Sequence, residues 1–384
     1  MQESQAQAAR RSTGPGPTVL VSANSCWNIV NFRVGLIQAL QGRGYRIVVA
    51  APDDEYRSKV EDLGVEFVSV PINSPGISVI EDLRLLARYA QVLRQLKPFA
   101  FLGFTAKPNI YGSLAARMAG VKVINNISGL GTVFIKRGPL TALVTRLYRF
   151  ALRGSSTIFF HNRDDLQLFV GMGIAPRERS QLLPGSGVDL ERFKPRPAVA
   201  AAGAPFRFLM VGRLLWDKGV AEYVEAARIV RRSHPDARFQ MLGRVGADNR
   251  TAVPSALVER WQAEGVIEYL GESDDVRTAM DQADCIVLPS YREGLPRALL
   301  EGSAMSKPLI ATDVPGCREV VEDGRTGFLC AVRSADSLAG AMTKMIAASP
   351  GERLRMGELG RRKIEQEYCE TRVIDKYLEA LDVR

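Results

Sequence analysis

Residues 284–301 read DCIVLPSYREGLPRALLE, and this stretch decides the fold class. The apolar run within 284–289 is typical of a buried strand in a parallel sheet, and a helix is expected from about Pro296. Glu293 then lies on a turn at the carboxyl end of the strand, where open α/β sheets bind their ligands. The stretch therefore predicts a ligand crevice as well as a sheet.

The turn and the helix offer groups for a ligand that carries both an anion and vicinal hydroxyls. Free backbone N–H groups of Gly294 and Leu295, with the positive end of the helix dipole, suit an anionic group. Glu301, about two helical turns beyond Glu293, can accept hydrogen bonds from hydroxyls. A diphosphate joined to a ribose has both features. The plain alternatives are a helix-face carboxylate at Glu301 and a helix cap at Glu293.

A second segment, GRLLWDKG at 212–219, follows an apolar strand that ends at Val211. Its cations, Arg213 and Lys218, can reach the same crevice. Prepositioned cations stabilise the negative charge that a departing diphosphate gains, and can replace a divalent metal in doing so. The alternative is a solvated pair of cations at the end of a strand.

Together, the Glu293-x7-Glu301 motif and VGRLLWDKG resemble the retaining glycosyltransferases of the GT-B fold, family 4 type. The segments VNFR, TAKPNIYGS and ISGLGTVF in the amino half are similar to bacterial enzymes that add N-acetylhexosamines to undecaprenyl-diphosphate-linked sugars. The resemblance implies an α/β fold with two Rossmann-like parallel-sheet domains that face a cleft, and a C-terminal helix that crosses back. It assigns catalysis to Arg213, Lys218 and Glu293, and donor binding to Gly212, Arg213, Lys218, Gly294, Leu295, Pro296 and Glu301.

The mechanism that the resemblance implies needs no nucleophile from the enzyme, because the leaving phosphate oxygen takes the proton of the acceptor. A UDP-sugar is the expected donor substrate, and neither a cofactor nor a metal is expected. Many relatives place a histidine in the loop that aligns with 126–131, where this chain has Ser128. That departure leaves the identity of any proton-accepting side chain open.

Candidate acceptor-binding residues follow other expected strands of the amino half. The loop at 24–33 lacks the GxGxxG of dinucleotide folds, which argues against a dehydrogenase. It could cradle a phosphate, with Arg33 as the cation and Trp27 as a platform for a sugar ring, or it could be a helix cap with Trp27 packed inward. The full set is Trp27, Arg33, Lys107, Asn109, Ser128 and His161, where a structural role is the alternative for His161.

Length and composition predict two domains in a reducing compartment. A chain of 384 residues is comfortable for two cores, and its five cysteines form no CxxC pair. No apolar run approaches the ~20 residues that span a bilayer, and none resembles a signal peptide. The expected division is a disordered tail at 1–17, an acceptor-side domain at 18–195, a linker at 196–204, a donor domain at 205–363 and the crossing helix at 364–384.

Positive charge is concentrated in the amino half. Residues 1–195 hold 24 basic and 14 acidic side chains, and no acidic residue lies between Asp82 and Asp164, where 13 basic ones occur. Such a field favours an anionic surface, and lipid is preferred to nucleic acid because no nucleic-acid motif accompanies the charge. The helix expected at 139–153 has an apolar stripe beside three arginines, which suits either a membrane surface or packing on the sheet.

The leading hypothesis is the transfer of an N-acetylhexosamine (GalNAc or GlcNAc) from a UDP-sugar to an undecaprenyl-diphosphate-linked saccharide. The expected location is the cytoplasmic membrane, peripherally on its inner face, and polysaccharide or glycan-precursor assembly would follow. A nucleotide-sugar epimerase of similar fold is disfavoured by the two histidines of the chain. A non-catalytic scaffold subunit is the other alternative. A glycosidase is excluded because the cations imply a diphosphate leaving group.

Overall fold

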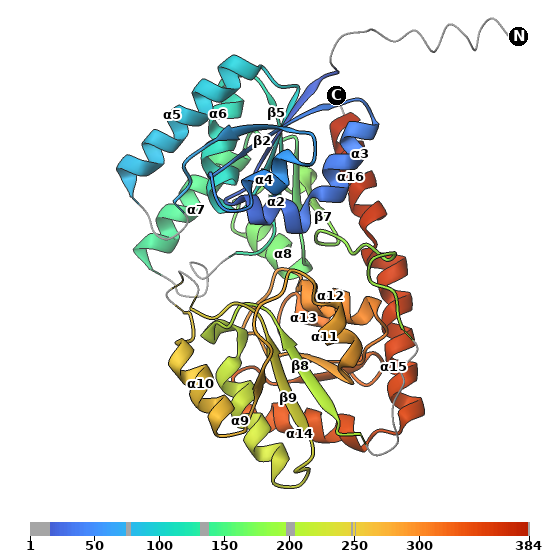
Figure 1. Cartoon of the computed structure of the whole chain (residues 1–384). Coiled ribbons are helices and arrows are strands. Elements are labelled where there is room, and N and C mark those ends of the chain that lie inside the picture. Colours follow the sequence, from blue (N-terminus) through green and yellow to red (C-terminus); the bar gives the residue numbers. More distant parts are fainter. Residues whose placement is uncertain are drawn as a thin grey trace, which may run out of the picture.

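The computed structural model describes residues 16–73, 78–130, 138–196, 204–246, 249 and 251–382. Within these residues the chain forms two parallel sheets, one after the other (Figure 1). The amino half has seven strands in the order β3-β2-β1-β4-β5-β6-β7, and the carboxyl half has six in the order β10-β9-β8-β11-β12-β13. In each sheet the order of strands reverses beside the first strand, and this is the point where doubly wound sheets place ligands. The predicted two-domain GT-B architecture is confirmed.

The strands match the apolar runs of the sequence closely. In the amino half they are β1 Thr18–Ser22, β2 Arg46–Ala51, β3 Glu66–Ser69, β4 Ala100–Phe104, β5 Lys122–Ile127, β6 Thr157–Phe160 and β7 Ser180–Leu182. In the carboxyl half they are β8 Arg207–Val211, β9 Arg238–Leu242, β10 Glu268–Tyr269, β11 Cys285–Leu288, β12 Leu309–Thr312 and β13 Gly327–Cys330. Two edge strands, β7 and β13, were not predicted.

Helices of the amino half connect its strands. They are α2 Cys26–Phe32, α3 Val34–Gly42, α4 Arg57–Glu61, α5 Val79–Leu96, α6 Ser113–Met118, α7 Pro139–Leu152 and α8 Arg163–Gly171, with a π-helical turn at Pro108–Gly112 and a 3-10 turn at Arg177–Arg179. After β1 the chain forms two helices in succession, α2 and α3, because Arg33, with a φ of −130° and a ψ of 0°, interrupts the helical backbone.

Helices of the carboxyl half follow the same alternation. They are α9 Val220–Arg231, α10 Ser255–Ala263, α11 Arg277–Gln282, α12 Arg297–Ala304, α13 Cys317–Val320, α14 Ala335–Ala347, α15 Pro350–Lys363 and α16 Glu370–Asp382, with a 3-10 turn at Trp216–Lys218 and a π-helical turn at Ile364–Tyr368. No helix among the described residues has the length and apolar character needed to cross a membrane.

Each sheet is buried between two apolar layers. In β1, Val19 and Val21 point to one core and Leu20 points to another, as the two-residue period of a strand requires. A strand that is covered on both faces is apolar at every position. This is why the parallel strands could be recognised from short uninterrupted apolar runs.

The last helix belongs to the core of the amino half. Val373, Tyr377 and Leu381 of α16 pack with the residues of α3 and β1, and Figure 1 shows α16 in red beside α3 in blue. The crossing helix expected at 364–384 is not continuous, because Cys369 is extended and bridges to Val188. Most of the tail expected at 1–17 and of the linker expected at 196–204 lies outside the described residues.

Candidate active site

Two loops of the carboxyl half meet at the carboxyl ends of β8 and β11. Gly219 has a φ of +75°, and a Cβ there would lie 2.1 Å from the carbonyl oxygen of Pro289, so only glycine allows this approach. It brings the Lys218 ammonium into an ion pair with Glu293 Oε1, and the side chains are 24% and 11% exposed. The hydroxyl of Ser290 donates to the same carboxylate oxygen at 2.6 Å. Glu293 is thereby held in one orientation at the crevice.

Gly294 lies where the two halves of the chain come together. A Cβ on Gly294 would be 1.7 Å from the carbonyl oxygen of Ser128, which follows β5 in the amino half. The carbonyl oxygen of Gly294 accepts a hydrogen bond of 2.7 Å from Asn162, the N-cap of α8. Gly316 supports the loop from the other side, at a φ of +82°. The predicted turn after β11 is therefore part of the contact between the halves.

Glu301 is held by an arginine that the sequence reasoning did not single out. The Arg297 guanidinium donates to Glu301 Oε1 through Nε at 2.8 Å and lies 2.6 Å from it through Nη2. The same guanidinium donates to Ser186 Oγ and Gly187 O at 3.1 Å and lies 5.5 Å from the ring centroid of Phe32 in α2. Glu301 is 9% exposed, so its carboxylate is fixed rather than solvated.

The other predicted donor residues lie just after β8 and just before α12. Gly212 has a φ of +145° and follows the last residue of β8, and Arg213 after it is exposed without an ion pair to any described residue. Leu295 is buried in the core beneath the loop, and Pro296 is the extended N-cap of α12. The helix begins within one residue of the predicted start. An exposed cation, a held carboxylate and the start of α12 therefore follow the carboxyl ends of the neighbouring strands β8 and β11.

Arg33 and His161 lie on the amino-half side. Arg33, 4% exposed, occupies the break between α2 and α3 with its guanidinium carbon 4.0 Å from the Phe104 ring centroid. Burial and, to a lesser degree, Arg297 lower the pKa of Arg33 to about 10, while Tyr377 opposes them. Burial and the Arg33 charge lower the pKa of His161 to about 3, so its imidazole is neutral at pH 7.

The remaining predicted acceptor residues do not gather at one point. Trp27 is 38% exposed on α2 rather than packed inward, and its ring meets Phe32 edge to face. Lys107 is engaged by Asp82 at 2.9 Å. Asn109 is buried and donates to the carbonyl oxygen of Asn126 at 2.8 Å. Ser128 is exposed and presents its backbone to Gly294.

Functional residues that the sequence reasoning missed include Arg297, Ser290 and Asn162. Arg297 is four residues before Glu301, which is the spacing of a helical ion pair and was the available signal. Ser290 and Asn162 act across turns and between the halves, and no local pattern identifies them. Arg292 also pairs with the buried Asp165 of α8. Burial raises the pKa of Asp165, and the Arg292 charge opposes that rise.

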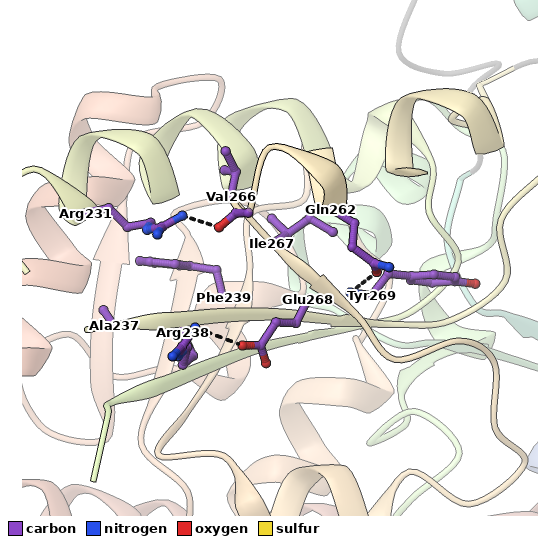
Figure 2. A pocket seen from close by; sticks show the side chains of 10 residues that line it. Arg231, Ala237, Arg238, Phe239, Gln262, Val266, Ile267, Glu268 and Tyr269 are labelled. Carbon is purple, nitrogen blue, oxygen red and sulfur yellow. Dashed lines mark hydrogen bonds and ion pairs between the residues drawn. The ribbon is translucent and has the colours of Figure 1, made fainter. Parts of the chain in front are cut away.

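The hollow drawn in Figure 2 lies elsewhere. Its lining comes from the ends of α9 and α10 and the first residues of β9 and β10, including Arg231, Arg238 and Glu268. These are the amino ends of the strands, opposite the edge that carries Glu293 and Glu301. In the part of the chain that the structure describes, no three His, Cys, Asp or Glu side chains are grouped to hold a metal ion.

Two family models divide the chain between them. Residues 192–363 match the family described as glycosyl transferases group 1, and residues 31–185 match the glycosyl transferase 4-like domain. Both Arg213 and the Glu293-x7-Glu301 motif fall within the first match.

Curated relatives and solved structures agree with these matches. An N,N'-diacetylbacillosaminyl-diphospho-undecaprenol α-1,3-N-acetylgalactosaminyltransferase of Campylobacter jejuni is 26% identical over 92% of this chain and 96% of its own length. A UDP-Gal:α-D-GlcNAc-diphosphoundecaprenol α-1,3-galactosyltransferase of Escherichia coli is 26% identical over 74% and 76%. The crystal structure of Anabaena HepE with UDP and glucose superposes with a TM-score of 0.78 at 17% identity, over 95% of this chain and 99% of that one.

Proposed function

The chain is a GT-B glycosyltransferase with a group 1 domain in its carboxyl half, and from this premise we propose that it transfers an N-acetylhexosamine from a UDP-sugar to an undecaprenyl-diphosphate-linked saccharide. The observation that carries the proposal is the set of charged side chains just after the carboxyl ends of β8 and β11. There Lys218 pairs with Glu293, Arg213 is exposed just after β8, and α12 carries Glu301. These groups match the charges and hydroxyls of a nucleoside diphosphate sugar.

The proposed chemistry assigns a task to each group. Arg213 and Lys218 stabilise the negative charge that develops on the departing diphosphate, so that the transfer needs no metal. Glu301 binds the ribose hydroxyls, and Arg297 fixes its orientation. Glu293 lies beside the transferred sugar, where a carboxylate supports an oxocarbenium-like transition state. In the retaining course that we propose, the leaving phosphate oxygen takes the proton of the acceptor hydroxyl.

The acceptor's lipid identity is supported by the relatives and by charge. Both curated relatives described above are named for diphospho-undecaprenol acceptors. The acid-free segment between Asp82 and Asp164 gives this half of the chain a positive field, which suits a lipid-linked diphosphate and the anionic membrane that holds it.

We further propose that the protein binds the inner face of the cytoplasmic membrane through the starts of α5 and α7. Val79, Ile80 and Leu83 at the start of α5 are 68%, 64% and 61% exposed, and Leu143 of α7 is 43% exposed. The opposite face of α7 packs inward through Thr145, so the helix also fills the packing role that was its alternative. Exposed apolar groups beside arginines suit the boundary of an anionic bilayer.

The decisive test is UDP release by the purified protein, without added metal, over a panel of UDP-sugars with and without an undecaprenyl-diphosphate-sugar in detergent. We expect release from a UDP-N-acetylhexosamine that depends on the acceptor and is lost in Glu301→Gln. Glu259→Gln, on the exposed face of α10, is the matched control and should behave as wild type. No release with any donor and acceptor would refute the transferase assignment and favour a scaffold role.

A further inference from the structure

Four polar side-chain atoms are buried without a hydrogen-bond partner at one edge of the amino-half sheet. They are Arg33 Nε, Thr105 Oγ1, Asn126 Oδ1 and His161 Nε2, out of nine such atoms among the described residues. Thr105, Asn126 and His161 lie at or just past the carboxyl ends of β4, β5 and β6, which are neighbours in the sheet. Buried polar groups normally find partners, so a cluster of unpaired ones indicates a site that something else fills.

Arg33 is the charged member of this group. It is 96% buried, and no ion pair joins it to a carboxylate of a described residue. Its contact with the Phe104 ring supports the cation, but its Nε–H remains buried without a hydrogen-bond partner. An unpaired buried charge is costly to a fold, and such charges usually serve a ligand.

Among the described residues, no acidic group acts on Arg33 to balance its charge. The groups that act on it electrostatically are Tyr377, a neutral phenol whose pKa burial raises to about 12, and Arg297, a second cation. His161 beside it is neutral at pH 7. Asn126 is tied to Tyr377 through a hydrogen bond of 2.6 Å from its Nδ2 to the phenol oxygen. The site therefore offers donors and positive charge.

We propose that Arg33 and His161 bind a phosphoryl group of a diphosphate substrate on the amino-half side of the crevice. The phosphoryl oxygens accept from Arg33 Nε and from His161 Nε2, and Asn126 Oδ1 accepts from a hydroxyl of the sugar attached to the phosphate. Arg297 reaches this region from the carboxyl half, so the anion also separates two cations that otherwise repel. The inference rests on the proposed function, in which the donor and the acceptor both carry diphosphates.

Burial of the site follows from the contacts between the two halves. Arg297 lies over Phe32, the residue before Arg33, and Gly294 lies against Ser128, two residues after Asn126. A ligand would enter when these contacts separate and would be enclosed when they form again. The low exposure of Arg33 is thus compatible with a phosphoryl group that binds between the halves.

The test compares Arg33→Met with Arg43→Met, which removes an exposed arginine at the turn after α3. Calorimetry measures the binding of three probes: UDP, farnesyl diphosphate and inorganic pyrophosphate. We expect Arg33→Met to lose at least tenfold in affinity for pyrophosphate and for one or both diphosphate substrates, without a lower melting temperature, because it removes an unpaired buried charge. Loss for UDP identifies the donor as the source of the phosphoryl group, and loss for farnesyl diphosphate identifies the acceptor.

Contrary outcomes are equally distinct. If Arg33→Met binds all three probes with wild-type affinity, the inference is wrong and Arg33 has a structural role. This conclusion holds whether or not the melting temperature of the variant is lower. Arg213→Met separates this failure from that of the proposed function: it should weaken UDP binding alone. An unchanged UDP affinity in Arg213→Met refutes the donor site while leaving the Arg33 site standing, and a wild type that binds no probe refutes both.

A spectroscopic measurement on the native side chains covers the case in which Arg33→Met does not fold. The chain has two histidines, so ¹⁵N-imidazole spectra contain two ring systems, and His234→Gln assigns the signals of His161. Pyrophosphate at saturation should shift the Nε2 signal of His161. An unmoved signal would overturn the proposal without any variant of Arg33.

Discussion

Asn162 donates a hydrogen bond of 2.7 Å to the carbonyl oxygen of Gly294, so a loop of the carboxyl half is fastened to the first turn of α8 in the amino half. The contact is possible because Gly294 has no side chain: a Cβ would lie 1.7 Å from Ser128 O. The loop that carries Glu293 is therefore oriented by the amino half as well as by its own sheet.

Gly294→Ala should keep the two halves from approaching this closely. We expect at least a tenfold loss of transfer rate, and a larger radius of gyration in solution scattering. Gly340→Ala is the control, because a Cβ at that helical position meets no atom within 4 Å. Wild-type turnover in Gly294→Ala would mean that catalysis does not need the closed contact.

Lys218 and Glu293 should be energetically coupled. Lys218→Met or Glu293→Gln alone leaves a largely buried group without its partner, which we expect to cost about 1–3 kcal/mol of unfolding free energy. The double variant should lose less than the sum of the two. The exposed pair Arg46 and Glu66 is the control, with an expected coupling below about 1 kcal/mol. Additive losses at Lys218 and Glu293, measured by urea unfolding, would contradict the pair.

Arg297→Lys should weaken donor binding while the chemical step persists. The planar guanidinium of Arg297 donates to Glu301, Ser186 and Gly187 together, and a lysine ammonium cannot reproduce this geometry. The Glu301 carboxylate therefore loses its fixed orientation. We expect KM for the UDP-sugar to rise about tenfold with a smaller change in kcat, which corresponds to ~1.4 kcal/mol of binding. Arg260→Lys, in the exposed helical pair with Glu264, should leave KM unchanged. An unaltered KM in Arg297→Lys would show that Glu301 needs no such support.

His161 should make the fold sensitive to acid. Its pKa is about 3 when folded against 6.5 for a free imidazole, so between these values the unfolded chain binds the extra proton. Stability is complete above pH about 6.5 and falls as the pH drops, at up to about 1.4 kcal/mol per unit. The difference between the urea midpoints at pH 7 and pH 5 should therefore be smaller in His161→Gln than in wild type. In His234→Gln this difference should equal that of wild type. Equal acid sensitivity in all three proteins would exclude a buried neutral His161.

The sheets were predictable because parallel strands are buried on both faces. Val19 to Val21 and Cys285 to Leu288 are uninterrupted apolar runs, and each begins or ends at a polar or turn residue. The start of α12 was also predictable from local sequence, since proline is tolerated at the start of a helix, where its missing N–H is not needed. By contrast, β7 is three residues long and lies at an edge, where a short polar-apolar segment carries little signal.

The site was predictable only as far as its motifs are local. Glu293 lies on the turn after β11, and Glu301 lies in the helix that follows this turn. Their location at the carboxyl end of the strand could therefore be predicted from the strand before them. The contact of Arg297 with Phe32, and that of Gly294 with Ser128, join residues far apart in the chain. Such contacts depend on how the two halves dock, and no periodicity or spacing within either half specifies that arrangement.

Helix α16 also determines when the amino half can finish folding during synthesis. Val373, Tyr377 and Leu381 complete the core around α3, although the strands of that sheet are translated long before them. Domains that emerge early usually fold early. Here the half that leaves the ribosome first must keep an apolar groove open until α16 has been made, while every strand of the carboxyl sheet is already available. That part of the amino-half core is therefore completed only after every strand of both sheets has been translated.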